Sequence, residues 1–262
     1  MDKLKITFGI ITTESTQSYL NDIIGSIRAQ CIPYDSYEII IVGNCSIADH
    51  DNLRVIGFDE SLRNMWITRK KNIITEEAKY ENIVYMHDYL ILENNWYKEF
   101  LEFGTEWDIC MNSIKNQDGS RILDWMGLPD DPVHGNVVLP YDYSGSNGMY
   151  IPGYFWVAKK SLMMKHRLNE DFCWGEGEDI EWSKRVIGGF PPIWLKNRDE
   201  LISAETKKTN FKYVINDKCI ILSVKHKFFP SDFFTAYDLH SGNESRPLES
   251  SPQNYEYLKY RT

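Results

Sequence analysis

The residues with the clearest chemical potential lie in one short acidic stretch, FCWGEGEDIEWSKRV, at positions 172–186. Helix stability accounts for one of its carboxylates without any function, because Glu181 and Arg185 make an i,i+4 ion pair and acidic residues favour a first helical turn. Helix stability explains Glu178 and Asp179 less well, since the glycines and tryptophans around them indicate a tight turn beside aromatic side chains. A carboxylate in such a cleft can act as a general base or hold a sugar hydroxyl. Four carboxylates fall within six residues here: Glu176, Glu178, Asp179 and Glu181.

A second candidate lies at residues 83–96 (IVYMHDYLILENNW), where an apolar run ends abruptly on His87-Asp88-Tyr89. Another apolar run follows at once, so these polar residues stand where the chain enters or leaves a core. Carboxylate oxygens bind hard divalent cations, and imidazole is a competent ligand for Mn²⁺. Packing at a strand end is the other interpretation, and we favour it for Tyr89 because tyrosine is a poor metal ligand.

The elements that must position these residues alternate between strand and helix patterns. This order predicts an α/β fold with a mostly parallel central sheet and helices on both faces, a three-layer α/β/α sandwich. Apolar runs predict strands at 4–12, 37–42, 53–58, 82–86, 107–111, 154–158 and 218–225. Apolar residues at helical spacing predict helices at 20–27, 66–79, 96–103 and 161–166, with another after the acidic turn.

Polar residues follow three of the expected strands, at 12–14, 43–46 and 87–89. These segments are far apart in the sequence. In a mostly parallel sheet, however, ligands bind beyond the carboxyl ends of the strands, and the topology brings such segments together. The sequence therefore predicts a ligand site built from these strand ends.

Composition narrows the class of protein. The chain has 262 residues and a formal charge of −9, and its basic residues are scattered, which argues against binding nucleic acid. No apolar run could span a bilayer, the first residues lack the layout of a signal peptide, and five widely spaced cysteines are typical of reduced thiols. We therefore predict a cytoplasmic protein. An aromatic content of 14% is common in carbohydrate-handling proteins, although a large core would look similar.

The chain reads as one domain over residues 1–230 followed by an appendage at 231–262. Residues 115–150 have little periodicity and several Gly, Pro, Asp and Asn, so a functional loop is expected there. Aromatic residues in the appendage could mediate a homodimer or peripheral contact with a membrane-associated acceptor, and both remain open.

Six motifs occur in a characteristic order along the chain. They are ITFGIITTE, Ser26-x-x-x-Gln30, Val42-Gly43-Asn44-Cys45-Ser46, Lys71-Asn72, His87-Asp88-Tyr89, and the W-G-x-E-D match at 174–179. In this order and spacing the chain resembles a nucleotide-sugar glycosyltransferase of the GT-A fold, most like the large family 2, over about residues 4–226. The resemblance makes residues 1–112 the nucleotide-sugar-binding half and residues 113–230 the acceptor-binding half.

The resemblance implies transfer of a sugar from a nucleoside-diphosphate donor, most commonly UDP-linked, to a hydroxyl of a glycan or glycolipid with inversion. Asp179 would be the general base, and Glu178 would hold the acceptor or the donor sugar. Donor-binding residues would be Thr12, Thr13, Glu14, Asn44, Lys71, Asn72, His87 and Asp88. Asp88 would face a divalent cation, Mn²⁺ or Mg²⁺, with His226 as a further ligand or simply a surface residue. Trp125, Trp174 and Glu176 would contact the acceptor.

The chain departs from the family pattern in two places. Gly43-Asn44 stands where relatives have two aspartates, so a carboxylate that normally touches the base is missing, although an amide can still bond a pyrimidine edge. The D-x-D position holds one carboxylate, Asp88. A non-catalytic nucleotide- or carbohydrate-binding module of the same fold is therefore an alternative. A sugar nucleotidyltransferase ranks last, because ITTESTQ is neither glycine-rich nor basic.

Overall fold

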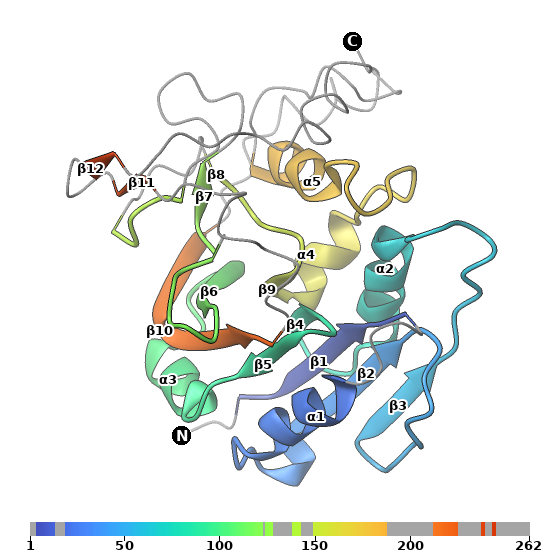
Figure 1. Ribbon diagram of the computed structural model, residues 1–262. Helices are drawn as coiled ribbons and strands as arrows, with labels where there is room; N and C mark the ends of the chain where they lie inside the picture. Colours follow the sequence, from blue (N-terminus) through green and yellow to red (C-terminus); the bar gives the residue numbers. More distant parts are fainter. Residues whose placement is uncertain are drawn as a thin grey trace.

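The computed structural model describes residues 4–13, 19–122, 124–127, 138–142, 149–187 and 212–224, with the backbone of 237–238 and 243–244. An eight-stranded sheet lies at its centre, in the order β3-β2-β1-β4-β9-β6-β10-β5 (Figure 1). The strands of this sheet are β1 (Ile6–Ile11), β2 (Tyr37–Val42), β3 (Leu53–Ile56), β4 (Asn82–His87), β5 (Leu90–Leu92), β6 (Ile109–Lys115), β9 (Phe155–Lys159) and β10 (Tyr213–Ser223). Two short two-stranded antiparallel sheets are β7 (Met126–Gly127) with β8 (Met149–Tyr150) and β11 (Tyr237–Asp238) with β12 (Asn243–Glu244).

The sheet is mostly parallel, as the sequence predicts. Parallel pairing joins β1 to β2 and β4, β2 to β3, and β6 to β10. Strand β9 runs antiparallel between β4 and β6, and β5 runs antiparallel to β10 at the edge. Strands from both sides of residue 112 therefore share one sheet, and the division into a donor half and an acceptor half stays a proposal. The appendage at 231–262 lies outside the described residues apart from β11 and β12.

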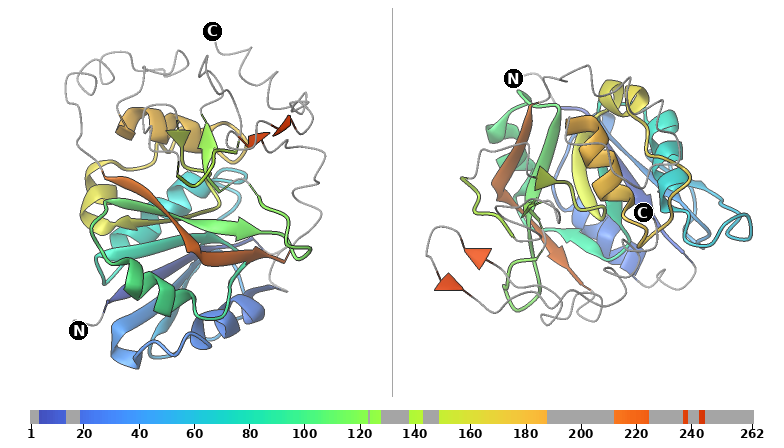
Figure 2. Two further views of the ribbon diagram at one scale, coloured as in Figure 1. Left: turned by 90° about the vertical axis from the view of Figure 1, so that its left-hand side faces the viewer. Right: turned by 90° about the horizontal axis from the view of Figure 1, so that it is seen from above.

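Helices cover both faces of the sheet and make the three-layer arrangement (Figures 1 and 2). Helices α1 (Leu20–Arg28) and α3 (Trp96–Phe103) pack into one core cluster, together with Ile6, Phe8 and Ile10 of β1. Helices α2 (Ile67–Glu77), α4 (Lys160–Lys165) and α5 (Glu178–Ile187) contribute to a second cluster that takes Ile11 of β1. Because side chains alternate along a strand, one short apolar run supplies both cores.

The Ser26-x-x-x-Gln30 motif has a structural role in this fold. Ser26 Oγ accepts a hydrogen bond from the Leu92 amide at 3.1 Å. Gln30 Nε2 donates to the Glu93 carbonyl at 3.0 Å, and Gln30 Oε1 accepts from the Tyr97 amide at 3.1 Å. These side chains satisfy the Leu92 amide at the end of β5 and the Tyr97 amide in the first turn of α3, and they add a bond to the Glu93 carbonyl between the two elements. They therefore fix the chain directly after His87-Asp88-Tyr89.

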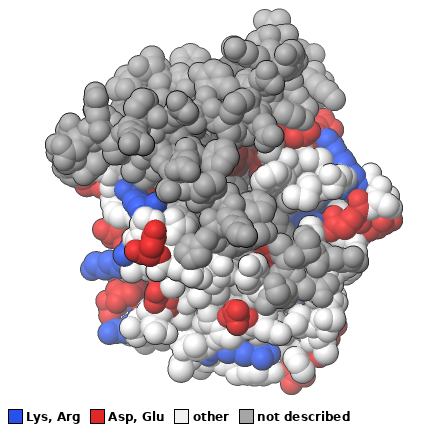
Figure 3. All heavy atoms as spheres, in the orientation of Figure 1, with Lys and Arg blue, Asp and Glu red and all other residues white. Residues whose placement is uncertain are grey.

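Acidic and basic side chains are interspersed over the described part of the surface seen in Figure 3. Among the described residues, no helix combines the length and the apolar character needed to cross a bilayer.

Candidate functional site

The first part of the site lies where the order of the strands reverses. From β1 the chain moves outward through β2 and β3 and then returns to the other side of β1 as β4. The carboxyl ends of β1 and β4 flank the crevice in which doubly wound sheets bind ligands. Thr12 follows β1 and Asp88 follows β4, both buried, and Thr12 Oγ1 donates to Asp88 Oδ2 at 2.6 Å. Two of the three polar strand ends expected from the sequence thus meet here.

Lys71 brings a buried cation to the same end of the sheet from α2. Its side chain is 1% exposed, its ammonium group donates to the Gly153 carbonyl, and it lies 4.7 Å from the centre of the Trp156 ring. The Gly153 amide donates to Asp179 Oδ2 at 2.9 Å. The backbone of one residue, Gly153, therefore connects Lys71 to the acidic turn, because its carbonyl accepts from Lys71 and its amide donates to Asp179.

Glu178 completes a cluster of one cation and two carboxyl groups. Burial, and then the charge of Asp179, raise the pKa of Glu178 to about 8, while Lys71 opposes the shift. Burial lowers the pKa of Lys71 to about 8, against the pull of both carboxylates. Burial also raises the pKa of Asp179, opposed by the Gly153 amide and by Lys71. Near neutral pH the favoured state therefore leaves Lys71 charged and Glu178 protonated.

We expect this cluster to make the stability of the protein depend on pH. Because the folded-state pKa of Glu178 lies above its ordinary value of 4.5, its contribution to stability is fully present below pH 4.5. That contribution is lost as the pH rises towards about 8. Glu178→Gln removes the titration, so its melting temperature should fall less than that of the wild type, by several degrees, between pH 5 and pH 8. Thermal melts across this range test the prediction, and parallel curves for the two proteins would contradict it.

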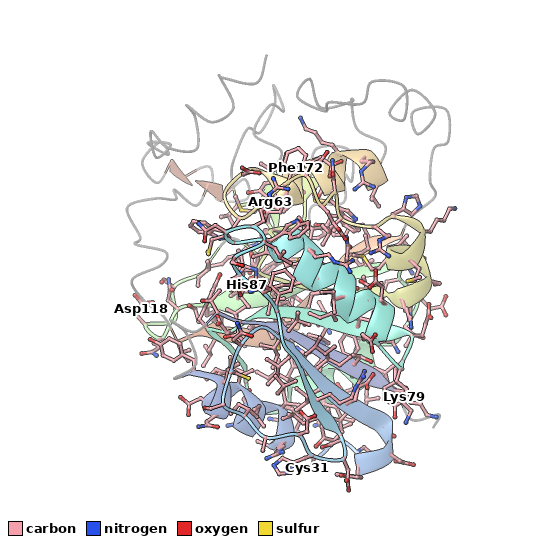
Figure 4. The ribbon with its side chains drawn as sticks, turned by 90° about the vertical axis from the view of Figure 1, so that its right-hand side faces the viewer. Cys31, Arg63, Lys79, His87, Asp118 and Phe172 are labelled. Carbon is pink, nitrogen blue, oxygen red and sulfur yellow. The ribbon has the colours of Figure 1, made fainter. Side chains whose placement is uncertain are left out.

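His87 lies beside this cluster as a neutral imidazole. Burial, followed by the charge of Lys71, lowers the pKa of His87 well below its usual value. Its Nδ1 lies 3.2 Å from the hydroxyl of Tyr89, which is buried in the first core cluster, as expected for packing at a strand end. In Figure 4, His87 lies towards the same end of the molecule as Arg63 and Phe172, away from Cys31 and Lys79.

The acidic turn is held against the segment that leads into α2. Arg63 donates to the carbonyls of Glu170 and Asp171 at 2.6 and 2.5 Å, and Trp66 Nε1 donates to the Glu170 carbonyl at 2.7 Å. The Trp174 amide donates to the Met65 carbonyl at 3.0 Å. These bonds fix the chain just before Glu178, and the Gly153 amide holds Asp179 directly after it. The two carboxyl groups are therefore positioned by both contacts.

At Asp88 the protein offers only one ligand to a divalent cation. Among the residues that the structure describes, no three His, Cys, Asp or Glu side chains gather into a group that could hold a metal ion. Asp88 offers one carboxylate, and one of its oxygens accepts from Thr12. A cation such as Mg²⁺ is commonly held by one or two carboxylates and completed by substrate phosphates and water. Asp88 suits that arrangement, whereas His226 lies outside the described residues.

The other residues predicted to bind the donor lie in different surroundings. Thr13 is half-buried beside Thr12, and Asn44 Oδ1 accepts from the Phe58 amide at 3.3 Å. Asn72 is buried, and its amide group bonds Leu168 through both backbone groups at 2.9 and 3.1 Å. Its side chain thus ties α2 to the segment before the acidic turn. Glu14 lies outside the described residues.

The three residues expected to bind the acceptor differ in exposure. Trp125 is buried, with its ring 4.7 Å from that of Tyr213, whereas Trp174 is 46% exposed. Glu176 Oε2 accepts from the Cys173 amide at 2.8 Å and therefore caps its own turn. Of these three, Trp174 presents a face on which a sugar ring could stack. Their acceptor roles stay predictions.

The sequence analysis does not predict the roles of Gly153, which joins Lys71 to Asp179, or of Trp156, whose ring lies 4.7 Å from the Lys71 ammonium group. The dipeptide Pro152-Gly153 marks a turn. No local pattern shows that the turn packs against a helix beginning at Glu178, because that contact depends on the tertiary fold.

Comparison with solved structures defines the class to which this fold belongs. S. aureus TarS aligns with a TM-score of 0.57 and 12% identity over 85% of this chain and 37% of that one. S. aureus TarS 1–349 in complex with UDP-GlcNAc aligns with a TM-score of 0.57 and 14% identity, over 85% of this chain and 59% of that one. GalNAc-T7 with UDP, GalNAc and Mn²⁺ aligns with a TM-score of 0.58 and 13% identity, over 85% of this chain and 44% of that one. The chain thus has a GT-A-like fold, that of the nucleotide-diphospho-sugar transferases.

The likeness concerns the fold, and this chain spans about two fifths to three fifths of the length of those structures. No family model matches the sequence. No curated protein matches it either.

Proposed function

We propose that this protein is a glycosyltransferase that moves a sugar from a UDP-linked donor to a hydroxyl of a glycan or glycolipid, with inversion. One observation carries the proposal. Thr12 and Asp88 meet at the crevice of the sheet, and Lys71 is joined through Gly153 to Asp179 at the same end. Similar folds hold UDP in TarS 1–349 and UDP with GalNAc and Mn²⁺ in GalNAc-T7, which supports the class of donor.

Asp179 is the general base of this proposal. Burial raises the pKa of its carboxyl group, while the Gly153 amide and Lys71 favour the ionised form that a base requires. It takes the proton from the acceptor hydroxyl while that oxygen bonds to the anomeric carbon and the bond to the diphosphate breaks. Glu178 retains its proton near neutral pH and can therefore donate a hydrogen bond to a sugar hydroxyl.

The donor binds, in this proposal, across the carboxyl ends of β1, β2 and β4. Thr12, Thr13, Glu14 and Asn44 line the base and ribose pocket, with Asn72 and His87 supporting it, and Lys71 approaches the diphosphate or the donor sugar. Asp88 holds Mn²⁺ or Mg²⁺, with His226 as a further ligand. When bound, such an ion neutralises charge on the leaving diphosphate. Trp125, Trp174 and Glu176 serve the acceptor.

Titration calorimetry tests the donor half of the proposal. We expect UDP to bind, and to bind about tenfold more tightly with Mn²⁺ than with EDTA, because an ion at Asp88 offsets repulsion between carboxylate and diphosphate. Asp88→Asn should remove most of the difference between Mn²⁺ and EDTA. If UDP, GDP and dTDP all fail to bind, with or without metal, the proposed function is wrong.

A non-catalytic module of the same fold is the second candidate. It is favoured by the lone carboxylate at Asp88 and by the state of Asp179, both of whose oxygens accept backbone amide hydrogen bonds, from Gly153 and Ile180. Hydrolysis of UDP-sugars without an acceptor separates the two candidates, because an active transferase releases free sugar slowly and a binding module releases none.

A further inference from the structure

The absence of an aspartate at position 43, directly after β2, has a steric cause. Gly43 has φ +142°, and a Cβ built on it would lie 2.2 Å from the Thr12 carbonyl oxygen. A side chain other than hydrogen would push β1 and β2 apart where they enter the crevice. An aspartate at position 43 is therefore excluded, and because position 44 is an asparagine, the end of β2 supplies no carboxylate to the crevice.

The loop after β3 brings a different carboxylate to this position. Asn44 Oδ1 accepts from the Phe58 amide at 3.3 Å and so ties the loop to the end of β2. Two residues later, the Glu60 carboxylate accepts from the ammonium group of Lys70. The same ammonium group donates to the Thr12 carbonyl at 2.7 Å. Glu60 therefore lies at the rim of the crevice, one lysine away from the end of β1.

Lys70 is built to hold this carboxylate in place. Its side chain is 1% exposed and its ammonium group lies 5.0 Å from the centre of the Phe58 ring. A buried ammonium needs anionic or carbonyl partners, and Glu60 with Thr12 supplies them. The Glu60 side chain remains 30% exposed, so it is anchored on one side and open to solvent on the other.

We propose that Glu60, anchored by Lys70, reads the base of the nucleotide donor by accepting a hydrogen bond from its ring N–H. The inference rests on the proposed function and names the residue that sets donor specificity. Uracil, thymine and guanine carry a ring N–H on their pairing edge, whereas cytosine and adenine carry an acceptor nitrogen there. An ionised carboxylate only accepts hydrogen bonds, so it attracts the first group of bases and repels the second.

Nucleotide titrations of the full chain test the inference. We expect the wild type to bind UDP, dTDP or GDP at least about tenfold more tightly than CDP and ADP, the range for a hydrogen bond to a charged group. The UDP analogue methylated at N3, which lacks the ring N–H, should bind as weakly as CDP. In Glu60→Gln the side chain keeps its size and its oxygen for Lys70, but it also offers an N–H, so the preference for UDP over CDP and over methylated UDP should collapse.

Glu77→Gln is the matched control, because Glu77 also pairs with a cation, Arg54 at 3.2 Å, but lies at the other end of α2. It should keep the preferences of the wild type. If Glu60→Gln keeps them as well, or if methylated UDP binds the wild type like UDP, the inference is overturned while the proposed function stands. If the wild type binds no nucleoside diphosphate, the proposed function fails first. If Glu60→Gln does not fold, Glu60→Asp is measured in its place. Aspartate keeps the charge but has a shorter reach, and this variant should still reject CDP.

Discussion

Replacing Asp179 by Asn should abolish sugar transfer while leaving binding of the donor nearly unchanged. The amide oxygen of Asn can still accept from the Gly153 amide, as Asp179 Oδ2 does at 2.9 Å, so this link is kept, while the bond from the Ile180 amide to the second oxygen is lost. An amide cannot take a proton at neutral pH, however, and losing a general base costs about 10²- to 10⁴-fold in rate. We expect kcat to fall by about 10³-fold, with a Kd for UDP within about threefold of the wild type.

Asp171→Asn is the control for this experiment. Asp171 is an exposed carboxylate eight positions earlier on the same acidic segment, and its carbonyl, not its side chain, bonds Arg63. Its variant should transfer sugar at the rate of the wild type. A near-normal kcat in Asp179→Asn would move the role of base to another residue. A matching loss of UDP affinity would show instead that the substitution had disrupted the donor site.

The second large effect is expected at Gly153. A Cβ at this position would lie 2.9 Å from Glu178 Oε1 and 3.3 Å from Asp179 Cβ. Alanine therefore presses on the Glu178 carboxyl group and on the Asp179 side chain, and it strains the bonds of the Gly153 backbone to Lys71 and Asp179. Because a shift of about 1 Å in a catalytic group can cost about 100-fold, we expect kcat of Gly153→Ala to fall by about that factor. Overpacking should lower the free energy of unfolding by about 1–3 kcal/mol.

Gly25→Ala provides the matched control, since nothing lies within 4 Å of a Cβ at that position in α1. In a helix this change should stabilise the protein by about 0.5–1 kcal/mol and leave kcat alone. Both variants are tested by urea unfolding, which measures the loss of stability, and by steady-state kinetics, which measure the loss of kcat. Unchanged kinetics in Gly153→Ala would contradict the assigned link between Lys71 and Asp179. Retained UDP binding is expected, because Thr12 follows β1 and Asp88 follows β4, whereas Gly153 precedes β9.

Several elements follow from local patterns alone. The apolar run at 37–42 and the helical spacing at 96–103 match β2 and α3 at both ends. In α1 the four residues that carry the apolar spacing are all buried: Leu20, Ile23, Ile24 and Ile27. Such segments are predictable because burial of one face, or of both faces of a central strand, fixes the residue types that the sequence must contain.

The pairing and direction of the strands were harder to predict from the sequence. The predicted strand at 154–158 corresponds to β9, but its antiparallel insertion between β4 and β6 has no local signature. Strand β5, of three residues, is not among the predicted strands, because so short an apolar run does not distinguish a strand from a buried helical segment. Pairing partners and direction are decided by the whole sheet, since each strand offers the same backbone groups to either neighbour.

The sequence by itself determined the alternation of strands and helices, the three-layer sandwich, and the pairing of an acidic turn with a polar strand end as candidates for chemistry. These depend on residue type and spacing, which local burial and helix geometry dictate. Only the tertiary structure decided how the candidates are joined. It placed the Gly153 peptide between Lys71 and Asp179, excluded a side chain at position 43, and brought Glu60 to the crevice through Lys70. Such contacts join residues that are 10 to 82 positions apart, so no local pattern encodes them.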